Sequence, residues 1–290
     1  MRAAPLAGAQ MTEDERYLFD INGYIVVRDA LSADDIALAN AAIDRHTEEI
    51  RVRLGELSLS GGSEALRGST GRGDLDGALT WEEPYGRPFR DMLVNAKVVP
   101  YLHELLGSGF RLDHNLGILT MSKGAEGHVL HGSSGPAFDR HQYYIVREGR
   151  MHNGLTVVAY QLTDVNPGDG GLCVVPGSHK GNFPCPEAMR HGEAHGEFVK
   201  QITCKAGDCV IFTEAVTHGT LPWTADHPRR TALFRFSPGN MAYVPHAWPE
   251  EMLAMMSPEQ RLVMEPPYHP RLNRPALPLE GEPAADGSTR

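Results

Sequence analysis

The sequence has no apolar run long enough to span a bilayer, so we expect no membrane partner. Residues 1–10 contain one arginine and no apolar stretch, which is not the pattern of a secretory signal. Basic residues are also scarce: 27 Lys and Arg stand against 37 Asp and Glu, for a net charge of −10. Because phosphate binding needs a basic surface, we expect no nucleic-acid partner.

Closely spaced cysteines are lacking as well. The four cysteines form no Cys-x-x-Cys motif, and Cys173 and Cys209 lie inside apolar runs, as small core residues do. This usage predicts a reducing, cytoplasmic location. The chain has 290 residues, 41% of them hydrophobic, which is enough for one large domain with a sizeable core.

The first hundred residues predict a mostly helical region. Thr12 and Glu15 have the spacing of a capping box, which predicts a helix over 13–20. Further elements are expected in this order: a flexible tail over 1–10, a strand over 23–27, a helix over about 33–52, a long flexible loop over 55–80 that could act as a lid, and helices over 87–94 and 96–106.

Strand signals dominate after Phe110. Short apolar runs alternate with turns that contain Gly, Pro and Asp, and strands are expected over 110–121, 154–162, 171–175, 208–212 and 231–237. Strands this short and this numerous favour a sandwich or barrel over a parallel sheet. We therefore expect a single domain over 11–265, followed by a proline-rich wrap and tail over 266–290.

Three residues could carry chemistry together. His131 ends a strand-like segment before a glycine-rich turn, and His218 follows the strand expected over 208–212. Arg229 comes eleven residues after His218, at the start of the next strand. Two neutral imidazoles suit iron(II), and an arginine can hold a carboxylate through two parallel hydrogen bonds. A barrel-like sheet could bring these distant positions together.

The segments between and around these residues resemble the phytanoyl-CoA dioxygenase family of iron(II)/2-oxoglutarate oxygenases. The likeness runs from about Leu18 to Pro238 and includes Pro176-Gly-Ser-His-Lys180, Gly207-Asp208 and His218-Gly219. It implies a mainly β protein with flanking helices, folded as a double-stranded β-helix (a cupin-like jelly roll). It also implies iron(II) as cofactor and 2-oxoglutarate as cosubstrate.

The resemblance assigns roles position by position. His218 matches the second iron ligand, and Arg229 matches the arginine that anchors 2-oxoglutarate, with Arg230 as the alternative. Neighbours on a strand point to opposite faces, so only one of the two arginines can face the pocket. His131 is the preferred first iron ligand, and His141 is its rival.

The sequence departs from the family at the third ligand. The family's aspartate lies two residues after the first histidine, where this chain has Ser133 (or Tyr143, if His141 is the ligand). Four explanations stay open: a halide in the vacated position, another carboxylate such as Asp139, an iron held by the two histidines with 2-oxoglutarate and water, or an inactive site.

Asp113 and Asn115 are further candidates. They share one face of the expected strand over 110–121, where they could hydrogen-bond 2-oxoglutarate or the substrate. The sequence thus predicts an oxygenase that uses iron(II), 2-oxoglutarate and O2 to hydroxylate a small molecule at an unactivated C–H bond. The alternatives are an iron/2-oxoglutarate halogenase and a non-catalytic jelly roll that binds a small molecule.

Overall fold

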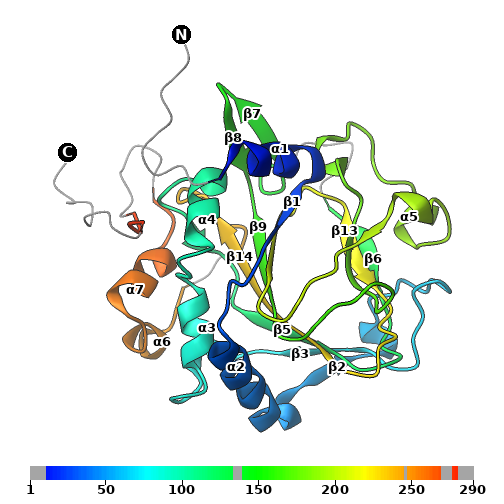
Figure 1. Ribbon diagram of the computed structural model, residues 1–290, viewed down its shortest axis with the longest axis horizontal. Helices are drawn as coiled ribbons and strands as arrows, with labels where there is room; N and C mark the ends of the chain where they lie inside the picture. The colour runs from blue at the N-terminus through cyan, green and yellow to red at the C-terminus, as the bar shows by residue number, and fades with distance from the viewer. Residues whose placement is uncertain (1–10, 133–138, 245–246, 269–275, 280–290) are drawn as a thin grey trace.

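The computed structural model describes residues 11–132, 139–244, 247–268 and 276–279. Most strands form two antiparallel sheets that face each other, with helices outside them (Figure 1). The large sheet has the order β1-β12-β9-β14-β5-β3-β2, and β4 also pairs with β14. Its strands are β1 (Tyr24–Val27), β12 (Cys209–Thr213), β9 (Thr156–Gln161), β14 (Arg229–Ser237), β5 (Gly117–Met121), β3 (Arg72–Leu75), β2 (Arg51–Arg53) and β4 (Arg111–Leu112).

The small sheet has the order β11-β10-β13-β6. Its strands are β11 (Lys200–Gln201), β10 (Gly171–Val174), β13 (His218–Leu221) and β6 (His128–His131). A separate hairpin pairs β7 (Tyr144–Arg147) with β8 (Arg150–Asn153). Two facing antiparallel sheets of this kind are a jelly roll, so the fold expected from the sequence is confirmed.

The helices lie outside the sheets. Those in the described residues are α1 (Glu13–Asn22), α2 (Ala33–Arg45), α3 (Arg87–Met92), α4 (Val99–Leu106), α5 (Glu187–Arg190), α6 (Glu250–Ala254) and α7 (Pro258–Met264), with short 3-10 turns at Thr47–Glu49, Gly55–Leu57, Ala78–Thr80, Ser178–Lys180 and Gly196–Phe198. In Figure 1, α3, α4, α6 and α7 gather on one side of the molecule, and α5 lies on the opposite side. No helix in this part of the chain is both long and apolar enough to cross a bilayer.

Strand β14 separates two cores because its side chains alternate between faces. Phe234 and Phe236 belong to the large core that also contains helix residues such as Phe89 and Leu102. Leu233 points the other way and packs against the core between the sheets. The hydrophobic residues of that inner core come from both sheets: Tyr24, Val157, Ala159, Val174, Ile202, Cys204, Val210, Phe212 and Val216. Side chains on this face of β14 therefore point into the interior of the jelly roll.

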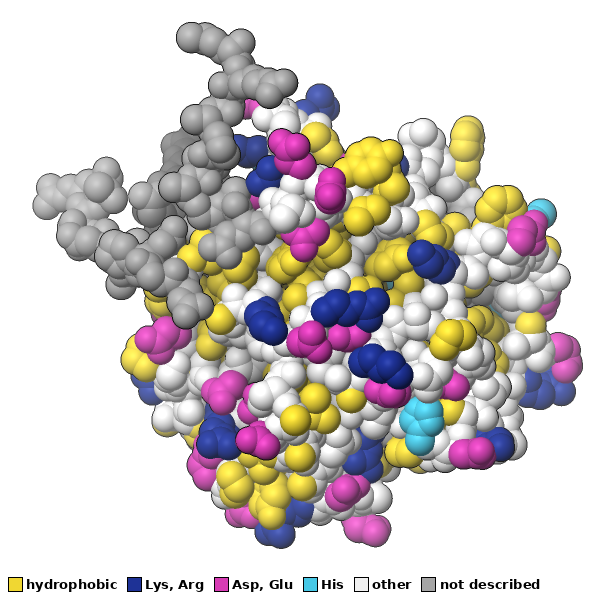
Figure 2. Space-filling model, in the orientation of Figure 1, with side chains coloured by type: hydrophobic (Ala, Val, Ile, Leu, Met, Phe, Trp, Pro, Cys, Tyr) yellow, Lys and Arg dark blue, Asp and Glu magenta, His cyan; other side chains and the backbone are white. Residues whose placement is uncertain are grey.

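The face shown in Figure 2 carries Lys and Arg interspersed with Asp and Glu, and no basic stripe runs across it. Several exposed charges of the described chain are paired, including Arg45 with Glu82 at 2.8 Å and Lys205 with Asp164 at 2.9 Å. Such exposed pairs contribute little to stability. The arrangement fits a net charge of −10, set by 37 acidic and 27 basic residues.

Two local expectations for the N-terminal region differ in outcome. The capping box is confirmed, since the Thr12 hydroxyl accepts from the Glu15 amide at 3.1 Å. The helix expected over 33–52 instead ends at Arg45, and the chain turns through Thr47–Glu49 into β2. Capping residues mark the start of this helix, but no glycine marks its end, which is why the sequence overextended it.

The loop expected over 55–80 is also wrong in part, because it contains β3, which pairs with β5. The Gly71-Arg-Gly73 stretch suggested flexibility, yet Gly73 is needed for close packing. A Cβ at Gly73 would lie 2.3 Å from Thr120 Oγ1 and 2.5 Å from Ile50 Cγ2. The preceding segment is tied down too: the Val129 amide donates to the Leu59 carbonyl at 3.0 Å. These contacts do not support a freely moving lid.

Asp113 forms a buried junction at the end of β4. Its side chain is fully buried and accepts from Ser237 Oγ at 2.6 Å, from the Tyr243 amide at 2.9 Å and from Arg111 Nη1 at 3.3 Å. The carboxylate thereby joins β4, the end of β14 and the segment that follows β14. Buried carboxylates satisfied in this way stabilise a fold only while all of their partners remain.

We therefore expect Asp113→Ala to lower the free energy of unfolding by about 3 kcal/mol, because it leaves buried donors without an acceptor. Asp226→Ala is the matched control: its side chain is 90% exposed and pairs only with Lys123, so we expect a change within about 0.5 kcal/mol. Urea denaturation measures both. An Asp113→Ala protein that kept its stability but lost 2-oxoglutarate binding would favour the cofactor-binding role instead.

Candidate metal centre

The two predicted iron ligands lie opposite each other on neighbouring strands. β6 and β13 are antiparallel, and their register pairs His131 with His218. The two imidazole ring centroids are 4.2 Å apart. Antiparallel pairing places facing residues within about 5 Å, so the sheet itself brings together two histidines separated by 87 positions (218 − 131).

Both imidazoles are oriented by backbone carbonyls. His131 Nδ1 lies 3.0 Å from the Val129 carbonyl oxygen, and His218 Nδ1 lies 2.8 Å from the Val216 carbonyl oxygen. A carbonyl only accepts, so each Nδ1 carries the hydrogen and each Nε2 keeps a lone pair for a metal. Burial, followed by the nearby His218, lowers the pKa of His131 to about 4, which keeps this imidazole neutral at physiological pH.

A third donor, Glu214, comes from the turn between β12 and β13. The Val216 amide donates to the Thr213 carbonyl at 3.0 Å, which closes the turn directly after β12. The Glu214 amide is held by the Leu155 carbonyl at 2.9 Å. These contacts fix the backbone of Glu214, so the side chain leaves from a constrained position four residues before His218.

The Glu214 carboxylate points to the histidine pair. Its Oε2 lies 3.6 Å from His218 Nε2, and its Oε1 accepts from Arg235 Nε at 3.2 Å. One donor atom from each of His131, Glu214 and His218 can be chosen so that all three lie within 4.8 Å of one another, and the described part of the chain holds no other group of this kind. Burial would raise the pKa of Glu214, but His218, Arg235 and His131 outweigh it and hold the pKa below its ordinary value.

Sequence reasoning did not find Glu214, because its spacing from His218 carries no signal of a shared site. Spacing of four residues places two ligands on one face of a helix, but Glu214 and His218 flank a turn between strands, where the same spacing carries no such implication. Two imidazoles and one carboxylate are the donor types of non-haem iron(II) sites, so the residues present fit the expected metal.

His128 is a second residue that the sequence did not single out. Its ring centroid is 4.4 Å from that of His131, although strand alternation would place residues three apart on opposite faces. An irregularity explains this: Thr220 pairs with His128 while His218 pairs with His131, so β6 holds one extra residue. Such bulges re-aim side chains beside active sites. Burial, followed by His131 and Arg72, lowers the pKa of His128 to about 3.

The other predicted metal ligands lie elsewhere. His141 packs its ring against Tyr243, with centroids 5.4 Å apart, and its amide donates to Asp139 Oδ1 at 2.7 Å. Neither residue joins the group formed by His131 and its two partners among the described residues. Ser133 lies outside the described residues. The metal-binding role of Asp139 stays a prediction, and its observed contacts do not support it.

Arg229 and Arg230 lie on opposite faces of β14, as alternation requires. Arg230 turns outward to Asn40 Oδ1 at 3.0 Å and to the Asp44 carboxylate. Arg229 turns inward and is only 3% exposed, and its Nη1 donates to Met121 Sδ at 3.3 Å. Its Nε is buried without a hydrogen-bond partner among the described residues.

A buried guanidinium without an acidic partner is costly unless an anion binds there. Burial, followed by Arg72, lowers the pKa of Arg229 to about 10, so the side chain stays charged at neutral pH. Arg229 and Arg235 share one face of β14, because they are separated by an even number of residues. Arg235, which contacts Glu214, and Arg229 therefore face the same interior.

The two remaining candidates do not gather at the histidine pair. Asp113 is engaged in the junction described above, and Asn115 is exposed. Their predicted roles in binding 2-oxoglutarate stay predictions that their contacts do not favour.

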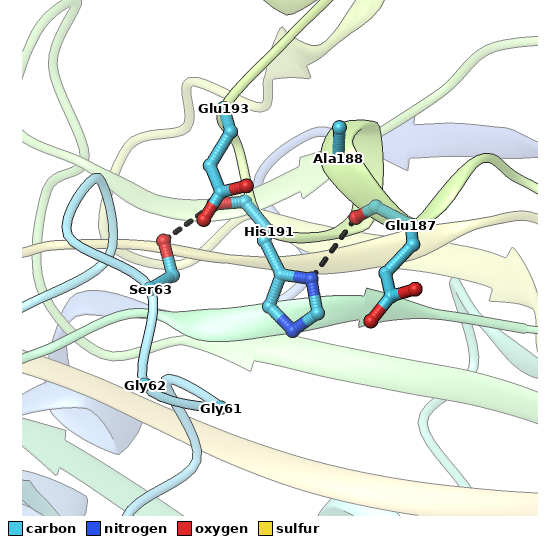
Figure 3. A pocket seen from close by; sticks show the side chains of 7 residues that line it. All are labelled: Gly61, Gly62, Ser63, Glu187, Ala188, His191 and Glu193. Carbon is cyan, nitrogen blue, oxygen red and sulfur yellow. Dashed lines mark hydrogen bonds between the residues drawn. The ribbon is translucent and has the colours of Figure 1, made fainter.

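A surface hollow is lined by residues other than the His131, Glu214 and His218 group (Figure 3). Its lining residues are Gly61, Gly62, Ser63, Glu187, Ala188, His191 and Glu193. The Ser63 hydroxyl donates to the His191 carbonyl at 2.5 Å, and His191 Nδ1 bonds to the Glu187 carbonyl at 3.0 Å. The first bond joins the segment before β3 to the end of α5, and the second lies within α5 and its C-cap.

Comparison with solved structures shows the same fold in enzymes of known cofactor. HygX from Streptomyces hygroscopicus, solved with nickel and 2-oxoglutarate bound, is 18% identical, with a TM-score of 0.64 over 81% of this chain and 90% of HygX. The α-ketoglutarate-dependent epimerase SnoN from nogalamycin biosynthesis is 21% identical, with a TM-score of 0.54 over 81% of this chain and 86% of SnoN. The carbocyclase SnoK from the same biosynthesis is 15% identical, with a TM-score of 0.56 over 88% of this chain and 95% of SnoK. At these identities the likeness establishes the fold.

No curated protein sequence matches the chain. A family model described as phytanoyl-CoA dioxygenase (PhyH) matches residues 19–231. This range covers the helical N-terminal part, both histidines and Arg229, which is well over half of the 290 residues. The chain therefore belongs to the phytanoyl-CoA dioxygenase family, which depends on iron(II) and 2-oxoglutarate.

Proposed function

We propose that this protein is an iron(II)/2-oxoglutarate-dependent oxygenase that hydroxylates a small molecule at an unactivated C–H bond. The observation that carries the proposal is the cross-strand pair of His131 and His218, each held by a carbonyl at Nδ1 and free at Nε2. When bound, iron and 2-oxoglutarate supply the oxidising power, with O2 as the other substrate.

The side chains of this chain perform three tasks. His131 and His218 hold the metal as neutral imidazoles in a fixed tautomer. Arg229 binds the far carboxylate of 2-oxoglutarate, since it is a buried cation with no acidic partner among the described residues. The apolar core between the sheets keeps the adjoining interior dry, which strengthens the ionic contact with 2-oxoglutarate.

The fold alone does not determine which reaction follows the activation of O2. SnoN is named an epimerase and SnoK a carbocyclase, so this fold serves several reactions. Halogenation would need a vacant ligand position, and the buried Glu214 carboxylate beside His218 weighs against a vacancy. We take hydroxylation as the outcome and keep a small-molecule substrate and a cytoplasmic location as parts of the proposal.

Binding of iron(II) and 2-oxoglutarate distinguishes this oxygenase function from a non-catalytic binding role. Under strict exclusion of oxygen, the wild-type chain should take up about one iron(II), and the iron-loaded protein should develop a weak visible absorption band when 2-oxoglutarate is added. A chain that bound neither would be a small-molecule binding protein at most.

We expect His131→Ala and His218→Ala each to abolish iron binding and 2-oxoglutarate decarboxylation. Each change removes one metal donor and, at His218, a ring contact with Phe212 (centroids 4.9 Å apart), so the free energy of unfolding should change by less than about 2 kcal/mol. Anaerobic iron titration and succinate formation measure the effect. His195→Ala, at a side chain that is 58% exposed, is the control. Full activity in His131→Ala, together with its loss in His141→Ala, would move the first ligand to His141.

We expect Arg229→Ala to raise the 2-oxoglutarate concentration needed for half-maximal turnover, with iron affinity nearly unchanged. Loss of a buried charge-assisted contact costs roughly 2–4 kcal/mol, or roughly 30- to 1,000-fold in affinity. Arg230→Ala is the matched control on the opposite face of the same strand, and its effect should stay below about fivefold. The reverse ranking would assign the anchor to Arg230.

A further inference from the structure

We propose that Glu214 is the third metal ligand, so the carboxylate comes from the turn before His218 and not from the loop after His131. This inference rests on the proposed iron-dependent function and specifies the metal site within it. The family's aspartate position holds Ser133, whose neutral hydroxyl is a poor donor for iron(II). Glu214 would restore two imidazoles and one carboxylate from a different place in the chain.

The placement of Glu214 is that of an inward-facing ligand. The residue is 6% exposed, and the backbone on both sides is fixed by hydrogen bonds from the β12–β13 turn and from Leu155. A buried carboxylate costs several kcal/mol to desolvate, so it persists only where a cation compensates it. Arg235 compensates one oxygen, at 3.2 Å from Oε1.

The second oxygen of Glu214 points to a site for a cation. Oε2 lies 3.6 Å from His218 Nε2, which is too long for a hydrogen bond. His218 Nδ1 is engaged by the Val216 carbonyl, which leaves Nε2 as the ring nitrogen directed to Glu214. A carboxylate oxygen and a ring nitrogen, both donor atoms for iron(II), thus face each other in a buried space, an arrangement that a metal ion bound to both would stabilise.

Arg235 then acts as a positioning residue. Metal-ligating carboxylates are commonly hydrogen-bonded by a second group that fixes their orientation. Arg235 Nε holds Oε1 and leaves Oε2 directed to His218. The simpler alternative is that Glu214 serves only as the counterion of Arg235 and never contacts the metal.

With Glu214 as a ligand, the site should have no need of chloride. A protein carboxylate in the third position leaves no vacant protein-ligand site for chloride, so metal binding and turnover should not depend on chloride. Ser133 then has no role as a marker of halogenation. The family's aspartate can be replaced by Ser133 because Glu214 supplies the carboxylate.

The test is anaerobic titration of the wild type, Glu214→Gln and Glu126→Gln with cobalt(II), followed by its visible absorption. Loss of a ligand should weaken metal affinity by at least about 100-fold in Glu214→Gln and change the band pattern. Glu126→Gln is the matched control, because Glu126 is also 6% exposed but bonds to Ser58 and Leu59 and does not belong to the His131, Glu214 and His218 group. The double variant Ser133→Asp/Glu214→Gln should regain most of the lost affinity.

The outcomes separate the two levels of the proposal. A wild type that binds no metal overturns the iron-dependent function and this inference together. A wild type that binds metal, with Glu214→Gln within about twofold of it, leaves the function standing and makes Glu214 only the counterion of Arg235. If Glu214→Gln fails to fold, an anaerobic crystal of the wild type with iron(II) decides: a Glu214 oxygen bonded to the metal supports the inference, and a carboxylate bonded to Arg235 alone overturns it.

Discussion

The pairing of β6 with β13 is the contact on which the rest of the site depends. It brings His131 opposite His218, and the extra residue in β6 turns His128 to the same side. The two proposed ligands therefore come from strands, and carbonyls of the same chain segments fix their tautomers. A change of register by one residue would turn these side chains away from the interior.

Strand β14 supplies the positive charges that complement this site. Arg229 and Arg235 share its inner face, while the phenylalanines of the outer face pack under the helices. One strand therefore anchors the hydrophobic core and presents two guanidinium groups to the interior. Arg235 compensates Glu214, whereas Arg229 lacks an acidic partner among the described residues, so the two identical side chains differ in what they can bind.

The sequence predicted the fold, because short strands separated by turns and a family likeness constrain it directly. It also singled out His131 and His218, which the structure places opposite each other, and Arg229, which it buries; their roles as ligands and anchor stay predictions. It did not predict Glu214 or His128. Glu214 reaches the site through a turn, and His128 through a bulge, and neither geometry leaves a periodic pattern in the sequence. The sequence predicts flexibility over 55–80 because glycines are common in flexible loops. Glycine also permits close packing, as Gly73 does here, and the sequence alone does not distinguish the two.

The segment that precedes β3 has a further consequence for strand β6. β6 is the last strand of its sheet, and exposed edge strands invite pairing with other chains. Here the Leu59 carbonyl receives the Val129 amide, and the Leu66 carbonyl receives the Gly127 amide at 2.8 Å. The strand that carries His131 is thereby covered at Val129, and the residue before the strand is covered at Gly127. Its amides should exchange with solvent only when this cover opens, which protects the site against aggregation as well as local unfolding.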